Sequence, residues 1–281
     1  IRDSDTSIPG ANLIAGIGYI SGVKCMIMID DSGIKAGAAS EATIDKALGC
    51  LDIALKQKLP CVHLVESAGV DLPNYSVKLW SKFGSVFYKK AKLSAAGIPV
   101  IAILHGFSTA GGAYQIGMSD YVIGVKGNGM AALAGSALLK AATGENASNS
   151  DIGGVEMHSV VTGSVEYLVN DDAESIVTVR KLIDQLNWNE NDAQKTTLNF
   201  EDPEYPIEDL AGIVPTDYSK GYDVREVIAR LVDKSGFIEL KPKYGISMVC
   251  AQAKIEGFQC GIIANNGPID TKGATKAAQF I

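Results

Sequence analysis

Short apolar runs alternate with longer amphipathic segments along the first half of this chain of 281 residues. The runs 61–65, 98–104 and 121–125 have the length and composition of buried β-strands. Segments 40–57 and 75–96 carry apolar residues at helical spacing, and each leads into the next run. Strands joined by helices of this length form right-handed crossovers in a largely parallel sheet. The sequence therefore predicts an α/β fold.

Composition and charge exclude several classes of function. With a formal net charge of -7, the chain lacks the excess of basic residues that is typical of a nucleic-acid-binding protein. No apolar stretch reaches the roughly 18 residues that a membrane-spanning helix needs, so we expect no membrane partner. The five cysteines include no CxxC pair and lie mostly in apolar runs, which favours buried reduced thiols over disulfides or a zinc site. The chain begins at Ile1 rather than Met, which fits a removed targeting segment or a fragment and leaves the compartment open.

A pair of glycines follows the run 98–104. Residues 108–114 read Ser-Thr-Ala-Gly-Gly-Ala-Tyr, directly before a stretch, 114–118, that can open a helix. The N–H groups of Gly111 and Gly112 then lie at a strand-to-helix turn, where the main chain can approach a ligand closely and the first helical N–H groups are unpaired. Such donors can stabilise a developing oxyanion. A tight turn alone explains paired glycines equally well.

A second turn of small residues, 66–70, follows the run 61–65 directly. In sheets of this class, ligands bind where loops leave the carboxyl ends of the strands. We therefore expect this turn and the paired glycines to lie at the same edge of one sheet. Alone, the second turn reads as an ordinary strand-ending turn, but the joint occurrence of both favours a ligand site.

An internal repeat suggests more than one domain. Residues 20–31 recur at 255–266 with a constant offset of 235 and four identities in register. Because each copy has the pattern of a β-hairpin, chance similarity between two generic hairpins is the alternative. A real repeat implies one domain over 1–236 and the opening of its twin over 237–281, with the boundary near Gly236.

The chain also carries a set of short motifs that are weak singly and specific together. They cover most of 16–267 and are Gly16-Ile-Gly18 with Ser21-Gly22-Val23, Lys35-Ala-Gly37, Leu59-Pro-Cys61, Glu66-Ser-Ala-Gly69, Ser108 to Tyr114, Leu133-Ala-Gly135, Lys140-Ala-Ala-Thr-Gly-Glu145, Asp151-Ile-Gly-Gly154 with His158, and Tyr222-Asp-Val-Arg-Glu-Val-Ile-Ala-Arg230. With them the chain resembles the crotonase superfamily. It is more closely similar to the carboxyltransferase (β) subunits of biotin-dependent acyl-CoA carboxylases, in the methylcrotonyl- and geranyl-CoA branch.

This resemblance implies a crotonase-like ββα spiral in tandem domains, the second incomplete in this chain. It implies an enzyme that moves a carboxyl group from carboxybiotin to an acyl-CoA, at the α-carbon or at the γ-carbon of a vinylogous substrate, through an enolate. The implied partners are a biotin carboxylase, a biotin carboxyl carrier subunit that holds the biotin, and further copies of the chain in a hexamer. The implied location is the cytoplasm of a bacterium or the mitochondrial matrix of a eukaryote.

The resemblance also assigns roles to residues of the two turns. We predict that Gly111 and Gly112 are catalytic and form one oxyanion hole, which serves either the thioester or biotin. Tyr114 stands where the hydratase pattern has a glutamate, which argues against hydration of an enoyl-CoA. A carboxyltransferase tolerates this absence because the released biotin can take the substrate's proton. The predicted acyl-CoA-binding residues are Lys35, Ser67, Ala68, Gly69, Ala110, Ala113 and Tyr114.

Several other polar residues allow a functional and a structural interpretation. Lys35 can meet a CoA phosphate or a backbone carbonyl, or can simply be solvated. We expect His63, inside an apolar strand, to be a hydrogen-bonded core histidine, and His158 to orient a loop. Asp30 and Asp31 resemble a metal pair only superficially, because no third oxygen ligand is evident nearby, and we predict no metal.

Two departures from the family pattern leave the acyl group open. Ala68 stands where the family more often has glycine, which requires that its φ be negative. Ser136-Ala137 replaces a stretch that often carries paired prolines. Two other functions also fit the chain: a biotin-dependent acyl-CoA decarboxylase subunit, and a non-catalytic subunit that binds acyl-CoA or serves assembly.

Overall fold

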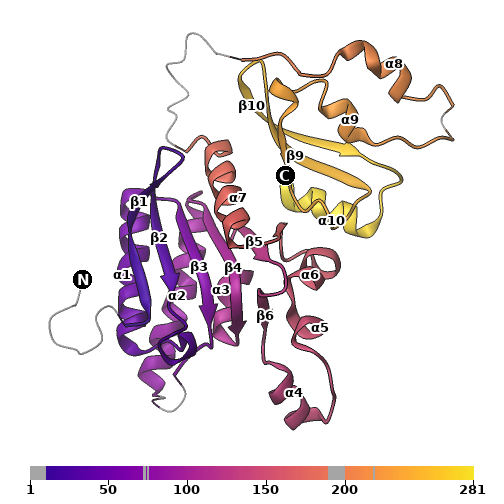
Figure 1. Ribbon diagram of the computed structural model, residues 1–281. Helices are drawn as coiled ribbons and strands as arrows, with labels where there is room; N and C mark the ends of the chain where they lie inside the picture. Colours follow the sequence, from indigo (N-terminus) through magenta and orange to yellow (C-terminus); the bar gives the residue numbers. More distant parts are fainter. Residues whose placement is uncertain (1–10, 72–73, 75, 189–199, 218) are drawn as a thin grey trace. The chain divides into compact units, whose positions relative to one another are not determined.

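The computed structural model of the chain describes residues 11–71, 74, 76–188, 200–217 and 219–281. The chain divides into two compact units, Ile1–Asp184 and Gln185–Ile281, each with its own sheet (Figure 1).

The described part of the first unit is built on a seven-stranded sheet with the order β1-β2-β3-β4-β5-β7, in which β6 also pairs with β4. β1 and β2 form an antiparallel hairpin, and the other pairs are parallel. The bounds are β1 Leu13–Ile20, β2 Val23–Asp30, β3 Cys61–Ser67, β4 Val100–Thr109, β5 Tyr121–Val125, β6 Met130–Ala132 and β7 Tyr167–Val169. The predicted α/β class and the three predicted strand runs are confirmed.

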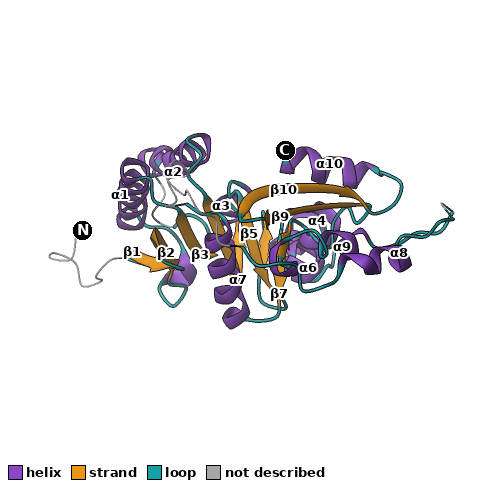
Figure 2. Cartoon of the chain, turned by 90° about the horizontal axis from the view of Figure 1, so that it is seen from above, coloured by secondary structure: helices purple, strands orange, loops and turns teal. Residues whose placement is uncertain are grey.

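Helices lie on both faces of this sheet. α1 (Glu41–Gln57) and α2 (Val77–Ala95) lie on one face, and α7 (Asp172–Gln185) lies on the other (Figures 1 and 2). α1 begins where the sequence predicts, because Ser40 and Thr43 form a capping box in which each side chain accepts the other's backbone N–H at 3.3 Å. Layers on both faces explain why β3 and β4 are almost continuously apolar.

Shorter helices follow the central strands. The helix predicted to open at 114 begins three residues earlier, at Gly111, because the chain turns sharply at Ala110 (φ 50°, ψ -120°) directly after β4. The bounds are α3 Gly111–Gly117, α4 Ser136–Thr143, α5 Asn149–Gly153 and α6 Val155–Met157, the last followed by a π-helical turn, His158–Thr162.

The second unit has a three-stranded antiparallel sheet with the order β10-β9-β8. Its strands are β8 Phe237–Glu239, β9 Met248–Ile255 and β10 Phe258–Asn265, and its helices are α8 Leu210–Ile213, α9 Val224–Ile228 and α10 Thr271–Phe280. Helix α9 lies within the family motif 222–230 and is short. Its buried Val224 and Ile228 pack in one apolar cluster with Val249 and Ala251 of β9.

Both copies of the repeated sequence form β-hairpins, as either explanation of the repeat predicts. Ile20 pairs with Val23, and Ile255 pairs with Phe258 at the same register. Both two-residue turns have positive φ at both positions, with φ 78° at Gly22 and 81° at Gly257. This is the backbone that two-residue hairpin turns require. The boundary near Gly236 stays a prediction, and the division into compact units falls earlier, after Asp184.

Candidate functional site

Ala110 holds a strained turn between β4 and α3. Its φ of 50° and ψ of -120° lie outside the regions that L-residues favour. Its N–H donates to the carbonyl of Ala132 (3.0 Å), and its carbonyl accepts from the N–H of Ala113 (3.1 Å). Such strain persists only where the surrounding structure fixes it, and it concentrates at functional sites. The turn therefore aims the start of α3 in one fixed direction.

The two predicted turns lie side by side. β3 and β4 are parallel neighbours whose last pair is Ser67 with Ser108, so both strands end at the same sheet edge, as the sequence predicts. A Cβ placed on Gly112 would lie 2.6 Å from the carbonyl oxygen of Ser67, and one on Gly69 would lie 3.3 Å from that of Thr109. The backbones of the two turns thus pack directly on each other.

Packing alone requires glycine at both positions of the pair. A Cβ on Gly111 would lie 2.4 Å from Cε1 of Phe83, while Gly112 is closed by Ser67. The structural interpretation of the paired glycines therefore has a firm basis in packing, and it does not compete with a role for their N–H groups. A larger residue at either position would disturb the packing as well as any ligand.

The N–H groups of the 67–69 turn are engaged inside the protein. The Ala68 N–H donates to the carbonyl of Ala36 (3.1 Å), and the Gly69 N–H donates to Oγ of Ser67 (3.2 Å). The Ser67 hydroxyl in turn donates to the carbonyl of Gly37 (3.0 Å). Gly69 has a φ of 87°, whereas Ala68 is not among the residues with positive φ, which meets the condition that alanine imposes there. This turn can shape a site, but these two N–H groups are not free donors.

Lys35 forms an ion pair with Asp71. Its Nζ lies 2.8 Å from Oδ2 of Asp71, and about half of its side chain (53%) is exposed. The Lys35 ammonium, together with the amide of Asn74, holds the pKa of the Asp71 carboxyl below its usual range. The ammonium is therefore paired with a carboxylate rather than solvated alone.

Three aromatic rings line the side of α3 that faces α2. Phe83 and Phe87 meet edge to face with ring centroids 5.1 Å apart, and Phe87 meets Tyr114 in the same way at 5.7 Å. Phe83 is buried, while Tyr114 is 56% exposed. The surface beside the paired glycines is therefore aromatic, with no carboxylate at position 114.

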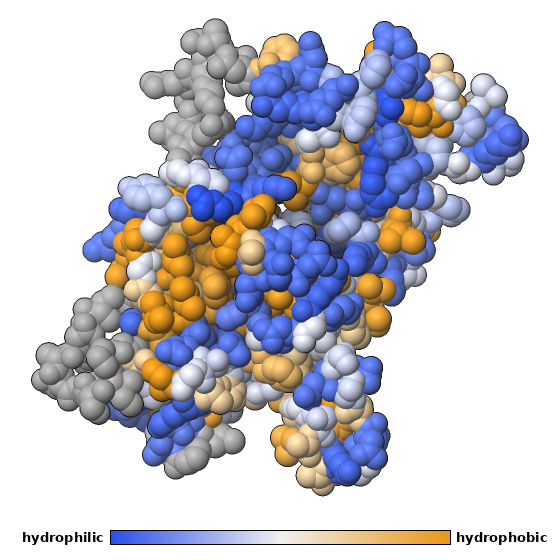
Figure 3. All heavy atoms as spheres, viewed as in Figure 1, coloured by the Kyte–Doolittle hydropathy of each residue, from blue (hydrophilic) through white to orange (hydrophobic). Residues whose placement is uncertain are grey.

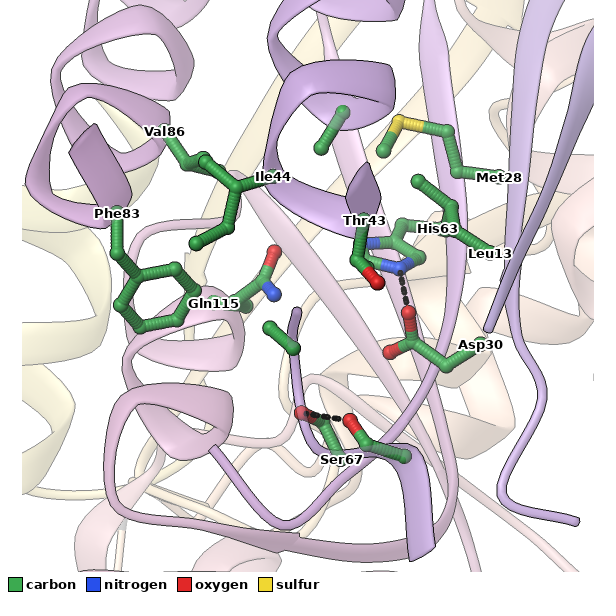
Figure 4. A pocket seen from close by; sticks show the side chains of 13 residues that line it. Leu13, Met28, Asp30, Thr43, Ile44, His63, Ser67, Phe83, Val86 and Gln115 are labelled. Carbon is green, nitrogen blue, oxygen red and sulfur yellow. Dashed lines mark hydrogen bonds and ion pairs between the residues drawn. The ribbon is translucent and has the colours of Figure 1, made fainter. Parts of the chain in front are cut away.

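A buried polar chain lies beneath this site and includes residues that sequence reasoning missed. Nζ of Lys90 lies 3.4 Å from Nδ1 of His63. Nε2 of His63 lies 3.1 Å from Oδ1 of Asp30, a contact drawn in Figure 4. His63 is a hydrogen-bonded core histidine, as predicted. Burial of Lys90 could have been predicted from the sequence, because Lys90 falls at helical spacing in the apolar stripe of α2 that also holds Phe83, Val86 and Leu93.

A small cavity adjoins the side chains of His63 and Asp30. It is lined by Asp30, His63, Ser67 and Phe83 among others, and it has about 20 Å³ in which the centre of a water molecule can lie, enough for one ordered water. The side chain of Gln115 points into it from α3 (Figure 4), and its Oε1 is buried with no hydrogen-bond partner among the described residues.

The remaining polar candidates have structural partners. His158 contacts the carbonyl of Ala131 through Nε2 (2.8 Å) and Oγ1 of Thr162 through Nδ1 (2.9 Å), so it connects its own π-helical turn to β6. Asp30 binds His63, and Asp31 accepts the N–H of Gly33 (3.0 Å). Within the described residues no group of three or more His, Cys, Asp or Glu could hold a metal, and the expected absence of a metal stays a prediction.

The cysteines agree with the expectation of buried reduced thiols. All five cysteines are free thiols, and four of them are buried. Burial raises the pKa of Cys25 to about 12 and that of Cys61 to about 11. In the part of the chain that the structure describes, no helix is both long and apolar enough to cross a bilayer.

Comparison with known proteins places this geometry in a family. Residues 2–281 match the carboxyl transferase domain. The chain belongs to the carboxyl transferase domain family. It is 41% identical to the mitochondrial methylcrotonoyl-CoA carboxylase beta chain of Dictyostelium discoideum, over 98% of this chain and 47% of that protein.

Two solved structures resemble this carboxyl transferase domain over 98% of its length. The beta subunit of P. aeruginosa geranyl-CoA carboxylase is 44% identical, with a TM-score of 0.61 and 52% of that chain covered. Transcarboxylase 12S, solved as a hexamer with hydrolysed methylmalonyl-CoA bound, is 30% identical, with a TM-score of 0.88 and 54% covered. These likenesses confirm the crotonase-like fold. The chain spans about half the length of the relatives it matches.

Proposed function

We propose that this carboxyl transferase domain acts in an enzyme that moves a carboxyl group from carboxybiotin to an acyl-CoA. The observation that carries the proposal is the direct packing of the 110–112 turn on the 67–69 turn at the carboxyl edge of the sheet. That edge is where α/β sheets bind ligands. Membership of the family supports the same reaction.

The N–H groups of Gly111 and Gly112 are the proposed oxyanion hole. They belong to the first turn of α3, whose N–H groups have no helical partner, and the strained Ala110 fixes their direction. When the acyl-CoA loses a proton, charge develops on the thioester oxygen. A pre-aimed donor at that oxygen is worth about 3 kcal/mol of barrier. The alternative, that this hole serves the ureido oxygen of biotin, uses the same donors.

The chain's own residues then need supply no proton acceptor. Carboxybiotin, held on a partner, would supply the carboxyl group, and the biotin left after release of that group would be the acceptor for the substrate's proton. At position 114, where a hydratase pattern carries a carboxylate, the phenol of Tyr114 packs on Phe87. The role of this side of the site is to hold the acyl-CoA and exclude water.

The proposed acyl-CoA site is formed around the two turns. Ser67, Ala68 and Gly69 shape one wall, and Ala110, Ala113 and Tyr114 shape the other. Lys35, whose side chain is about half exposed (53%), is the proposed contact for a CoA phosphate. The relatives are named for methylcrotonoyl-CoA and geranyl-CoA, both branched and unsaturated, so a thioester of this class is the first candidate substrate.

The whole protein is proposed to work in an assembly. Its partners are a biotin carboxylase, a biotin carboxyl carrier subunit and further copies of itself, as a hexamer. On the face seen in Figure 1, apolar side chains gather over the first strands of the sheet (Figure 3). Strand pairing places Ile14, Ile27, Ile29 and Leu64 on one face, and Ile14 is 59% exposed. Apolar patches of this kind mark protein interfaces.

The domain and cellular assignments remain part of the proposal. Domain 1–236 is the N-terminal carboxyltransferase domain, and 237–281 opens a second one, which the matching hairpins support. The protein is expected in the cytoplasm of a bacterium or the mitochondrial matrix of a eukaryote.

The reaction is tested with the full-length protein and free biotin, using malonyl-, methylmalonyl- and 3-methylglutaconyl-CoA as carboxyl donors. The proposal expects biotin-dependent decarboxylation of one of them. Binding of CoA without turnover of any would instead identify a non-catalytic acyl-CoA-binding subunit. A panel of straight, branched and unsaturated acyl-CoAs, assayed with carboxylase and carrier, then identifies the acyl group.

A further inference from the structure

A lysine lies fully buried under the proposed site. Lys90 is 0% exposed and belongs to the apolar stripe of α2, with Val86 and Leu93 on either side. An ammonium group in such surroundings costs several kcal/mol unless an opposite charge or hydrogen bonds compensate it. Burial accordingly lowers the pKa of Lys90, while the nearby Cys61 and Asp30 oppose that shift.

His63 connects this cation to a carboxylate. Nζ of Lys90 lies 3.4 Å from Nδ1 of His63, and Nε2 of His63 lies 3.1 Å from Oδ1 of Asp30. A lysine ammonium can only donate, so Nδ1 accepts and the Nε2–H donates to Asp30. The exposed fractions of the His63 and Asp30 side chains are 2% and 8%, so water screens the chain of charges poorly.

The other carboxylate oxygen holds the backbone of the site. Oδ2 of Asp30 accepts the N–H of Glu66 at 3.3 Å. The next residue is Ser67, whose carbonyl and side chain are the atoms that close the space at Gly112. Hydrogen bonds therefore link α2 to β3 and β3 to β2. The bond from the Glu66 N–H to Asp30 fixes the residue directly before the 67–69 turn, on which Gly112 packs.

We propose that Lys90 is a positioning residue which, through His63 and Asp30, anchors the Glu66 backbone and so holds the 67–69 turn against Gly112. The effect on catalysis rests on the proposed function, while the effect on the Glu66 amide does not. The positive charge of Lys90 and the negative charge of Asp30 are both buried and compensate each other through His63. Removal of one charge therefore leaves the other unpaired.

The first experiment removes each charge and then both in the full-length protein. Lys90→Met and Asp30→Asn are each expected to lower the thermal midpoint. The decrease in thermal midpoint of the double variant is expected to be smaller than the two single decreases added together, because it leaves neither charge unpaired. Simple additivity of the two losses would overturn the proposed link. Lys92→Met is the matched control, since Lys92 is exposed on the same helix over the Tyr88 ring.

The second experiment separates positioning from a merely structural role. Hydrogen exchange of a peptide covering Glu66 is expected to quicken about fivefold to tenfold in Lys90→Met and in Asp30→Asn, as loss of one net hydrogen bond predicts. In carboxyl transfer with carboxylase and carrier, kcat is expected to fall at least about tenfold, with KM for the acyl-CoA within about twofold. Lys92→Met should leave both measurements unchanged.

The outcomes distinguish this inference from the proposed function. If exchange at Glu66 and kcat both stay at wild-type values in Lys90→Met, Lys90 is not a positioning residue. If the wild-type protein transfers no carboxyl group, the proposed function fails, and exchange at Glu66 together with the double-variant melting still tests the anchor. If KM for the acyl-CoA rises as much as kcat falls while hydrogen exchange at Glu66 is unchanged, Lys90 serves general stability and the proposal is overturned.

Discussion

At the scale of single residues, glycine 112 can be tested against a glycine of the same helix. A Cβ at 112 would lie 2.6 Å from the carbonyl oxygen of Ser67, whereas nothing lies within 4 Å of a Cβ at Gly117. Gly112→Ala is therefore expected to lower the thermal midpoint and to reduce kcat/KM at least about 100-fold, since it displaces a proposed oxyanion donor. Gly117→Ala should keep activity and gain a few tenths of a kcal/mol, because alanine favours helix. Full activity in Gly112→Ala would contradict the oxyanion assignment.

A second residue-scale prediction concerns the ion pair between Lys35 and Asp71. The folded protein lowers the pKa of Asp71, so the contribution to stability is fully present above the ordinary carboxyl value of 3.8 and is lost as pH falls through the lowered pKa. Asp71→Asn is expected to melt slightly below wild type at pH 7, and the gap is expected to be smaller at pH 3. Paired melting curves measure this, and Lys35→Met should reproduce the loss at pH 7. An equal gap at both pH values would rule out the carboxylate as its cause.

Individual polar residues show where sequence reasoning succeeds and where it stops. His63 is predictable as a core histidine because its neighbours in the strand are apolar. Its partners are not predictable, since Asp30 and Lys90 come from elements 33 and 27 residues away. In the same way, the sequence marks Gly111, Gly112 and Ser67, but it does not show that Ser67 closes the space at Gly112 or that Phe83 closes the space at Gly111.

At the scale of elements, the hairpin turns permit a clean test of backbone conformation. Gly22 has a φ of 78° and open space around a Cβ, so Gly22→Ala meets no clash and carries only the cost of positive φ. We expect a loss of about 1 kcal/mol in the free energy of unfolding. Gly16 lies in the same hairpin, also with open space, but its φ is not positive. Gly16→Ala should therefore be nearly neutral in urea unfolding, and equal losses in the two variants would refute the conformational explanation.

Elements with strong local signals were predicted accurately, and those that depend on distant packing were not. Strand β5 has the predicted bounds, and α1 begins one residue after the start of its predicted segment, 40–57. The start of α3 was placed too late, because only the tertiary contacts of Ala110 hold its unfavourable φ. Family resemblance supplied the rest of the site's interpretation, since no local pattern shows which turns of a parallel sheet pack together.

At the scale of the whole molecule, the two compact units differ in the size of their sheets, and buried thiols report on each. Cys61 belongs to the first unit and Cys250 to the second, and both side chains are fully buried. Burial raises the pKa of both thiols, so at pH 7 alkylation requires that the unit opens. The second unit has three strands in its described sheet against seven, and smaller units bury a smaller fraction of their surface.

We therefore expect the second unit to open first in urea. Pulsed alkylation followed by peptide mass analysis should modify Cys250 at a lower urea concentration than Cys61. Cys260, which is only partly buried, serves as the internal control and should react before either. Local opening with different free energies in different parts of a chain is the physical basis for this order. Modification of Cys61 and Cys250 at the same concentration would show instead that the units unfold as one cooperative body.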